Sequence, residues 1–304
     1  MSEFDNPEIF RSILETLPTG VYLVDRNRKI LFWNTGAEEI TGYLRQDVVG
    51  RFLRDHLLTV DGEIKKDLES DSTDPLSIAF RDGKSSSGEV SILHKEGYRV
   101  PIVLRTIPIR NLKSAVIGAA ECFERNFSAF EKSRRQVAVA ELGSLDLVTG
   151  VPNRVYMEKK LQESLKRFNA DHTRFSILVM ETDRMDHFRS SCGPGVVAAI
   201  HRVVAQTVAN SLRPADMIGC WNEHQFVILL VECKKSMVGT VGDRIRKIVA
   251  KSEIEWWGDK FHLTASFGGT ECRDGDTLEL LLERAEKSLA ESIAAGGNCA
   301  TDLS

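Results

Sequence analysis

Residues 216–230 read DMIGCWNEHQFVILL, in which two apolar runs enclose a short polar segment. The runs Met217–Trp221 and Phe226–Val231 have the length of strands, and the second is rich in β-branched and aromatic residues. The segment between them, Asn222–Gln225, is polar throughout, as is typical of a turn that faces water. The stretch therefore predicts a β-hairpin.

The sequence on both sides of this hairpin alternates between apolar strands and helices. The apolar run Arg174–Met180 predicts a buried strand, and Phe261–Gly268 predicts another. We expect helices over four segments, namely Asn153–Phe168, Gly195–Leu212, Met237–Lys251 and Thr277–Ala294. Strands that alternate with helices predict an α/β domain with a central sheet covered by helices.

The first 125 residues have the mixed pattern of an α+β domain. A helix is expected over Pro7–Leu17, and Asn34 is expected to cap a second, short helix because its side chain can accept a free backbone N–H. The acidic, serine-containing stretch Asp61–Asp74 predicts a surface loop. Strands are expected at Gly20–Val24, Lys29–Trp33, Gly88–Leu93, Arg99–Ile109 and Ala115–Phe123.

The segment Glu124–Leu145 connects the two halves and is predicted to be a helix. Its apolar residues, with Phe127 and Phe130 among them, follow a coiled-coil spacing that Arg134 and Glu141 interrupt. This pattern fits a short dimer stalk and fits equally a helix packed on its own domain. We therefore expect a first domain over residues 1–125, a linker helix over 126–145 and a second domain over 146–304.

Two motifs of the second domain resemble those of GGDEF domains, the domains of the diguanylate cyclases. Asp146–Arg154, DLVTGVPNR, resembles the DxLTGxxNR signature that opens these domains. The turn Asn222–Phe226, NEHQF, stands where active members have Gly-Gly-Asp/Glu-Glu-Phe. The opening motif has structural roles, since Asn153 can start a helix and Asp146 can pair with Arg154. It therefore supports the fold and not the activity.

The first domain resembles a PAS domain. The resemblance implies an antiparallel sheet with helices and a sensor role, and it leaves the ligand unknown. A pocket in it would be lined by residues such as Val21, Leu23, Leu31, Ile92, Val103 and Ile107. The matching residues are Asp25, Ile30, Asn34, Ala37, Gly42, Tyr43 and Val48–Arg51, with the stretches GYRVPIVLRTIPIRN and VIGAAECFERN.

The GGDEF resemblance implies that the metal site of a cyclase is lost here. A cyclase joins two GTP molecules, which requires Mg²⁺ held by carboxylates and cations that neutralise the phosphates. The first metal carboxylate of the family falls on Glu181, with Asp183 two residues on. The second falls on His224, and a neutral nitrogen donor suits Mg²⁺ poorly.

The other catalytic positions are also replaced. The glutamate that helps at the reacting centre falls on Gln225, which cannot take up a proton. The two glycines that admit the nucleotide fall on Asn222 and Glu223, which add bulk and a negative charge. The positions that read guanine and hold phosphate in the family fall on Arg189, Ala198, Ile293 and Gly297.

One ligand-binding element of the family is retained. Arg213 and Asp216 stand five residues before the turn, at the spacing of the RxxD inhibitory site that binds cyclic di-GMP. An arginine can bind phosphate or the guanine edge with two hydrogen bonds, and an aspartate can accept from guanine N–H groups. Arg246 falls where some members supply a second arginine from a neighbouring subunit or helix. The simpler interpretation of these residues is a salt bridge at a helix end.

Composition excludes several classes of function. The net charge of −4 gives no case for nucleic acid or an anionic membrane, and no apolar run is long enough for a membrane span. The six cysteines are far apart, without a CxxC pair, which favours a reducing cytoplasm. The start of the chain lacks the pattern of a signal peptide. We expect no resident cofactor and no metal.

Three hypotheses of function follow. The leading one is a cytoplasmic signalling protein in which a PAS sensor is coupled to a catalytically inactive GGDEF domain. That domain would bind cyclic di-GMP, a protein partner or a second copy of the chain. The alternative is an active diguanylate cyclase with a divergent site that uses Mg²⁺. The third is a dimerisation module that binds no nucleotide, and the pair Trp256-Trp257 is a candidate interface in any of these.

Overall fold

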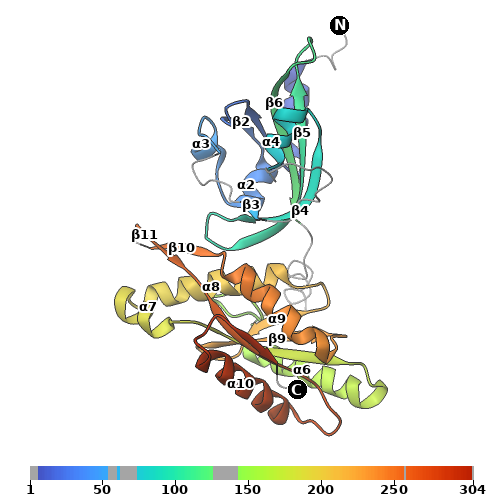
Figure 1. Ribbon diagram of the computed structural model, residues 1–304, viewed down its shortest axis with the longest axis vertical. Coiled ribbons are helices and arrows are strands. Elements are labelled where there is room, and N and C mark those ends of the chain that lie inside the picture. Colours follow the sequence, from blue (N-terminus) through green and yellow to red (C-terminus); the bar gives the residue numbers. More distant parts are fainter. Residues whose placement is uncertain (1–5, 54–59, 62–73, 126–142, 257, 303–304) are drawn as a thin grey trace. The chain divides into compact units, whose positions relative to one another are not determined.

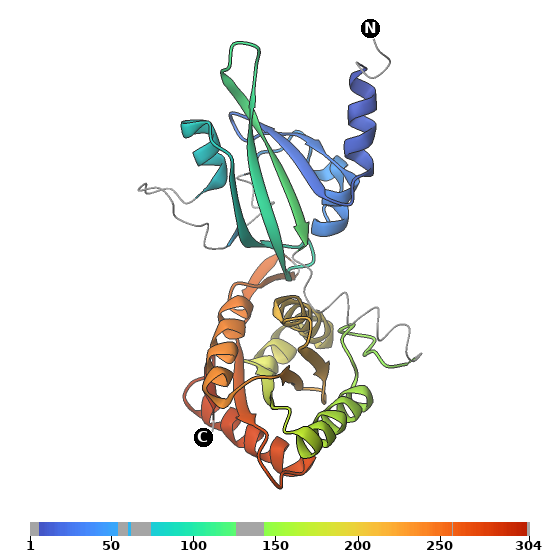
Figure 2. The same cartoon turned by 90° about the vertical axis from the view of Figure 1, so that its right-hand side faces the viewer.

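The computed structural model describes residues 6–53, 60–61, 74–125, 143–256 and 258–302 (Figures 1 and 2). The chain splits into two compact units, of which the first contains Met1–Glu96 and Val100–Asn126 and the second contains Gly97–Arg99 and Phe127–Ser304. Residues 126–142, over which most of the linker helix is predicted, lie outside the described residues, as does Trp257. No helix within the described ranges combines the length and apolar character needed to cross a bilayer.

The first unit is built on a six-stranded sheet, with strand order β2-β1-β6-β5-β4-β3. Every strand pair whose register is defined in this sheet is antiparallel. The strands are β1 (Gly20–Asp25), β2 (Ile30–Trp33), β3 (Val60–Asp61), β4 (Ser86–Leu93), β5 (Arg99–Arg110) and β6 (Val116–Arg125). The helices are α1 (Pro7–Thr16), α2 (Thr35–Thr41), α3 (Arg45–Val48) and α4 (Pro75–Asp82).

Asn34 fixes the link between β2 and α2 in the predicted way. Its side-chain oxygen accepts hydrogen bonds from the backbone N–H of Ala37 at 2.9 Å and of Val21 at 2.8 Å. The residue is fully buried, so these bonds are shielded from water. The α+β class of this unit is confirmed. The sequence analysis missed β3 and α4, which flank residues 62–73, the part of the predicted acidic loop that lies outside the described residues.

The second unit is built on a five-stranded sheet of order β13-β12-β7-β9-β8. Its pairs are antiparallel except for β12 and β13, which are parallel. The strands are β7 (Phe175–Thr182), β8 (Met217–Cys220), β9 (Gln225–Val231), β12 (Ala265–Glu271) and β13 (Ala300–Asp302). The helices are α6 (Arg154–Asp171), α7 (Met185–Cys192), α8 (Pro194–Ser211), α9 (Lys235–Val249) and α10 (Leu278–Ala294).

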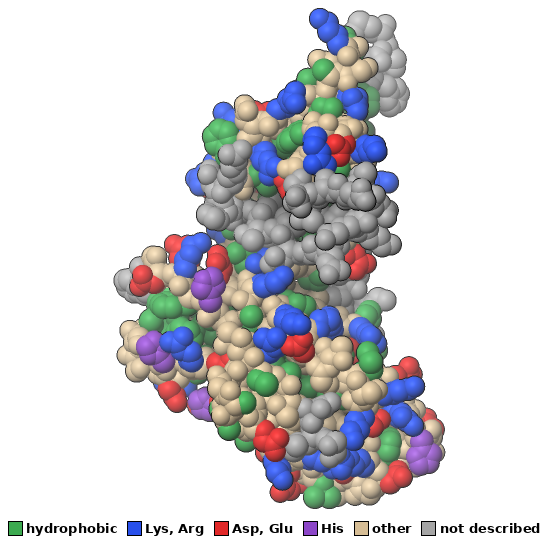
Figure 3. All heavy atoms as spheres, viewed as in Figure 1, with side chains coloured by type: hydrophobic (Ala, Val, Ile, Leu, Met, Phe, Trp, Pro, Cys, Tyr) green, Lys and Arg blue, Asp and Glu red, His purple; other side chains and the backbone are tan. Residues whose placement is uncertain are grey.

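Helices cover both faces of this sheet, which confirms the predicted α/β arrangement (Figure 1). Leu178 and Met180 of the central strand β7 pack with residues of α7, α8 and α9. Ile177 and Val179 point to the opposite face and pack with residues of α6 and α10. This alternation is what a strand buried on both faces requires. Acidic and basic side chains are interspersed on the surface of the unit, in keeping with the small net charge (Figure 3).

Two predictions about this unit are wrong in detail. The strand predicted over Phe261–Gly268 divides into β11 (Asp259–His262), which pairs with β10 (Glu253–Trp256) as a separate hairpin, and β12 in the main sheet. Asp146 does not pair with Arg154. Its carboxylate accepts from the backbone N–H of Thr149 at 2.8 Å and from the hydroxyl of that residue at 2.6 Å, and so closes the turn of the opening motif.

Candidate functional site

The hairpin of β8 and β9 brings its turn to the end of the central strand β7. Met180 of β7 faces Phe226 in the register of the sheet, and Glu181 faces Gln225. On its other side Glu181 faces Ser266 of β12. The sequence reasoning placed Glu181 and the turn together only by resemblance, and the sheet register now gives the physical basis.

The turn is closed by its own side chains. The side-chain oxygen of Asn222 accepts from the backbone N–H groups of His224 and Gln225, both at 2.9 Å. Its amide nitrogen donates to the side-chain oxygen of Gln225 at 2.9 Å, and the amide nitrogen of Gln225 reaches the Glu181 carboxylate at 3.4 Å. Asn222 therefore does not simply add bulk in place of a glycine. It orders the turn, as asparagine side chains do when they cap a local backbone bend.

The two carboxylates at the end of β7 differ in their surroundings. Glu181 is half-buried, and among the described residues its carboxylate accepts only the long hydrogen bond from Gln225. Asp183 accepts from the Ser266 hydroxyl at 2.6 Å with one oxygen and from the backbone N–H of Asn298 at 2.9 Å with the other. Asp183 thus ties β7 to the segment that follows α10.

A buried histidine lies beneath the turn, and the sequence reasoning missed it. His201 of α8 is 9% exposed and packs edge-on against the ring of Phe226, with 5.7 Å between ring centroids. Its Nε2 atom is buried and has no hydrogen-bond partner among the described residues. Burial lowers the pKa of His201, and the charges of His224 and Arg189 lower it further. His201 is therefore neutral near pH 7.

The remaining positions that the resemblance singled out differ in their exposure to solvent. Glu223, His224 and Arg189 are exposed, and Ala198 is partly buried. Ile293 is 44% exposed and presents an apolar side chain to water. Across the described ranges, no three His, Cys, Asp or Glu side chains come close enough together to hold a metal ion.

The base of the same hairpin carries a buried carboxylate. Asp216 is 6% exposed and accepts from the backbone N–H of Val231 at 3.1 Å, which ties the start of β8 to the end of β9. Its own backbone N–H donates to the carbonyl of Arg213 at 3.0 Å. Burial raises the pKa of the Asp216 carboxyl, while backbone hydrogen bonds from Val231 and Arg213 to the carboxyl and the charges of Arg213 and Arg244 oppose the rise. Asp216 is therefore a structural group and a potential acceptor at once.

The second arginine beside this carboxylate is Arg244 of α9. One of its terminal nitrogens donates to the Ser211 carbonyl at 2.9 Å, just before Arg213. The pKa of Arg244 is lowered by burial and by the charge of Arg213, and it is raised by Asp216. Arg213 itself is exposed. The positive charges of Arg213 and Arg244 both act on the buried Asp216 carboxyl, an electrostatic arrangement that favours an anion.

Arg246, which the sequence reasoning grouped with Arg213 and Asp216, is bound elsewhere. Its guanidinium donates to Asp243 at 2.7 and 2.9 Å and to the side-chain oxygen of Asn298 at 3.0 Å. Residues two apart on a helix point in directions about 200° apart. Arg244 and Arg246 therefore contact different parts of the unit.

The predicted PAS pocket is only partly correct. Ile92 and Val21 are buried, but Leu31 is 55%, Val103 41% and Ile107 38% exposed, so these three lie outside the core. Apart from Arg99 at the start of the strand, the buried residues of β5 have the opposite parity, and Leu104 and Thr106 are among them. Successive residues of a strand point to opposite faces of the sheet. Choosing the wrong alternate residues as inward-facing therefore exchanges all the buried residues of the strand for exposed ones.

Comparison with protein families agrees with this geometry. The model of the "Diguanylate cyclase, GGDEF domain" family matches residues 144–299, which is just over half of the chain. The model of the PAS fold matches residues 8–123.

Two curated diguanylate cyclases are similar to this chain in sequence. The probable diguanylate cyclase DgcE of Escherichia coli K12 is 24% identical over 275 residues, which cover 88% of this chain and 23% of DgcE. Diguanylate cyclase DgcP of Pseudomonas aeruginosa is 24% identical over 185 residues, which cover 60% of this chain and 27% of DgcP. The chain thus spans about a quarter of the length of these two curated relatives.

Solved structures share the fold of the second unit. Diguanylate cyclase SiaD of Pseudomonas aeruginosa, in complex with its activator SiaC, matches with a TM-score of 0.53 at 23% identity, covering 57% of this chain and 66% of SiaD. The GGDEF domain of DgcB from Caulobacter crescentus, in complex with c-di-GMP, matches with a TM-score of 0.51 at 21% identity, covering 53% of this chain and 94% of that domain. With its family model, its fold and a PAS fold that precedes it, this chain belongs to the GGDEF family.

Proposed function

We propose that this chain is a PAS-coupled signalling protein whose GGDEF domain binds cyclic di-GMP without making it. The observation that carries the proposal is the cluster at the base of the hairpin, where Arg213 and Arg244 lie beside the buried Asp216. Cyclic di-GMP offers two phosphates to guanidinium groups and guanine N–H groups to a carboxylate. Because Val231 already fixes Asp216, little side-chain entropy is lost when the ligand binds.

The turn end of the hairpin supports the non-catalytic part of the proposal. A metal-assisted attack on an α-phosphate needs a set of oxygen ligands. Among the described residues, the Glu181 carboxylate accepts a long hydrogen bond from Gln225, and Glu223 is exposed. Both oxygens of Asp183 are engaged, and His224 is a nitrogen donor. These residues do not fit Mg²⁺. Gln225 can neither accept a proton nor carry a charge.

Relatives suggest what else the domain contacts. The GGDEF domain of DgcB was solved with c-di-GMP, and SiaD was solved with a protein activator. By likeness, we include a protein partner or a second copy of this chain among the ligands of the domain. The PAS fold then supplies the input, and ligand binding shifts populations of conformers. The six free thiols favour a reducing cytoplasm as the site of action.

Calorimetric titration of the full chain with cyclic di-GMP tests the proposal. We expect saturable binding that Arg213→Ala weakens at least about thirtyfold, the effect of a lost interaction of about 2 kcal/mol. Arg167→Ala is the matched control, because Arg167 is an exposed arginine of α6 and is not among the residues that act on the Asp216 carboxyl. The absence of binding by the unaltered protein, or equal binding by Arg213→Ala, would reject the receptor.

A further inference from the structure

A row of polar side chains crosses the core of the PAS fold. Tyr22 of β1 faces Glu121 of β6, and Glu121 in turn faces Thr106 of β5. The hydroxyls of Tyr22 and Thr106 donate to different oxygens of the Glu121 carboxylate, and the bond from Thr106 measures 2.6 Å. The exposed fractions are 1% for Tyr22, 2% for Glu121 and 0% for Thr106. An acid is therefore buried on β6, the strand that lies between β1 and β5 in the sheet.

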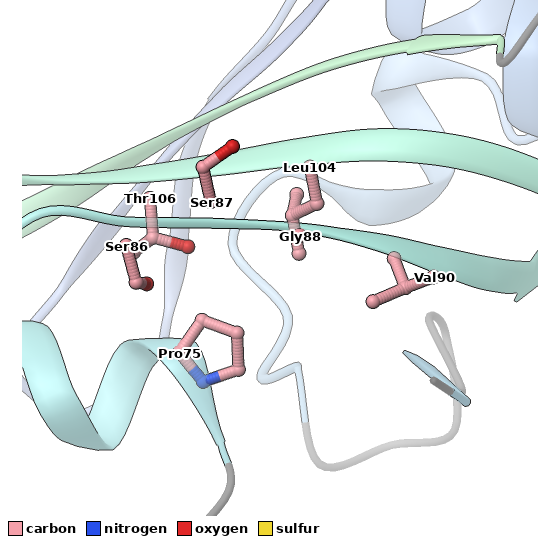
Figure 4. A pocket seen from close by; sticks show the side chains of 7 residues that line it. All are labelled: Pro75, Ser86, Ser87, Gly88, Val90, Leu104 and Thr106. Atoms are coloured by element: carbon pink, nitrogen blue, oxygen red, sulfur yellow. The ribbon is translucent and has the colours of Figure 1, made fainter. Parts of the chain in front are cut away.

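The surroundings of this row exclude water. Thr106 lies across a narrow gap from Pro75, at the start of α4, and from Ser86 of β4 (Figure 4). The gap is too narrow for a water molecule. On the β1 side, the ring of Tyr22 stacks on the buried ring of Trp33, with 5.4 Å between ring centroids. The hydrogen bonds of the row are therefore not exchanged for bonds to water, which makes each of them count for more.

The charged groups that face Glu121 do not neutralise it. No cation is bonded to Glu121 among the described residues. Asp74, at the start of α4, is an anion, and the cation Arg28, between β1 and β2, is bound to Asp74. β1 contributes Tyr22, whose own pKa is raised by burial and by Glu121, and β5 contributes the neutral Thr106. Burial raises the pKa of Glu121 and Asp74 adds to the rise, while the bonds from Thr106 and Tyr22 and the charge of Arg28 oppose it.

The row has two hydrogen-bond arrangements, one for each protonation state of Glu121. An ionised carboxylate only accepts, so both hydroxyls donate to it. A protonated carboxyl carries an O–H donor on one oxygen, so one of the two hydroxyls has to turn and accept from it. Burial favours the protonated form, because an unpaired anion is costly where water is excluded. The protonation of one buried acid therefore sets the side-chain bonds between three neighbouring strands.

We propose that Glu121 is the proton-binding group of a pH-sensitive switch in the PAS core. When a proton from solvent is bound to a carboxyl oxygen of Glu121, the row is neutral and β6 is held between β1 and β5. When that proton returns to solvent, an unpaired negative charge lies in the core, and opened conformers of these strands become more populated. β6 ends at Arg125, so the switch acts on the strand from which the chain continues to the second unit. The proposal concerns the input of the protein and stands independently of what the GGDEF domain binds.

Hydrogen exchange of the full chain, measured by mass spectrometry of peptides from β1, β5 and β6, tests the switch against Glu121→Gln. Glutamine offers one acceptor and one donor group, like the protonated acid, and it does not ionise. The stabilisation from a raised folded-state pKa is fully present below the ordinary value of 4.5 and is lost as the pH rises through the folded-state pKa. Compared with the variant at the same pH, the unaltered protein should therefore exchange faster as the pH rises above 4.5, by up to about tenfold for each pH unit until the folded-state pKa is passed.

Matched variants separate a switch from a merely structural role. Glu89→Gln removes an exposed carboxyl of β4 and should exchange like the unaltered protein at every pH. Peptides of β7 and β9, in the second unit, should exchange equally in Glu121→Gln and in the unaltered protein. Thr106→Val keeps the shape of the side chain and removes a donor to the ionised form, so the pH at which the change in exchange is complete should rise.

A titration followed by carbon-13 NMR of glutamate carboxyls in the full chain observes the proton directly and needs no variant to fold. We expect one carboxyl of the unaltered protein to titrate above the usual range of glutamate, and this signal to be absent from Glu121→Gln. Two results would overturn the proposal. One is a ratio of exchange rates between the unaltered protein and Glu121→Gln that is constant with pH, and the other is the titration of every glutamate within or below its usual range.

Discussion

The two ends of one hairpin have different chemistry. At the turn, Asn222 and Gln225 form a closed set of amide hydrogen bonds, and His224 is exposed. At the base, Asp216 remains a buried carboxylate between Val231 and two arginines. The strands between them keep the buried apolar register of the sheet.

The contrast shows that folding and catalysis make separate demands on this hairpin. The sheet needs Phe226 and its apolar neighbours, which are retained. The turn needs only a backbone bend, which an asparagine cap provides as well as glycine does. Asp216 serves the fold through Val231, and this structural role would keep a ligand-binding carboxylate in place even without activity.

The largest effect is expected at the base of the hairpin. Arg244→Ala should weaken cyclic di-GMP binding about thirtyfold, because a guanidinium that bonds phosphate is lost. Arg246→Ala is the control on the same helix and should change binding less than threefold, since Arg246 is bound to Asp243 and Asn298. Calorimetry measures both. If Arg246→Ala weakens cyclic di-GMP binding more than Arg244→Ala does, the base of the hairpin is not the binding site.

A smaller effect, on stability, separates the two roles of Asp216. Asp216→Ala should lower the free energy of unfolding by about 1–3 kcal/mol, because the buried N–H of Val231 loses its acceptor. Asp216→Asn keeps an acceptor oxygen and should retain this stability while cyclic di-GMP binding falls. Urea denaturation and calorimetry provide the two measurements.

The pH dependence of the Asp216→Asn variant sharpens this test. Burial raises the folded-state pKa of Asp216 above its ordinary value of 3.8, so the folded state prefers the protonated form. The stabilisation from this preference is present below pH 3.8 and is lost as the pH rises through the folded-state pKa. Asparagine cannot ionise, so Asp216→Asn should gain stability relative to the unaltered protein as the pH rises toward 7. A constant difference across that range would contradict the assignment.

The smallest effect is expected at the turn. His224→Asp should change cyclic di-GMP affinity less than twofold, because His224 is exposed at the other end of the hairpin. The free energy of unfolding should change by no more than about 0.5 kcal/mol, as is usual for surface substitutions. A large loss of cyclic di-GMP binding would mean that the two ends are not independent.

Apolar patterns predicted most of the fold, because burial on a sheet or helix leaves a strong period in the sequence. The hairpin, β7 and the four long helices of the second unit were all found in this way. Parity within the PAS strands was harder, because Val103 and Ile107 are apolar yet lie on the exposed face of β5. The hairpin of β10 and β11 was missed because β11 and β12 read as one run.

The sequence could predict only those parts of the candidate site whose residues lie close together along the chain. Arg213 and Asp216 lie on one tight turn, so their proximity follows from the chain. Arg244 lies on α9, far from Asp216 in the sequence. Its position on the helix relative to the buried Val241 and Ile245 directs its side chain to the Ser211 carbonyl near the base of the hairpin, whereas Arg246 points elsewhere. The orphan nitrogen of His201 and the acid Glu121 gave no signal, because single polar residues within apolar segments are usually satisfied.

The most direct test of the central claim is an incubation of the purified chain with GTP and Mg²⁺ or Mn²⁺, with cyclic di-GMP measured by mass spectrometry. We predict no product above that of a heat-inactivated control, because the turn of the hairpin has lost its metal and proton-accepting carboxylates. Sustained formation of cyclic di-GMP that Glu181→Gln abolishes would contradict the account and show an active cyclase with a rebuilt site.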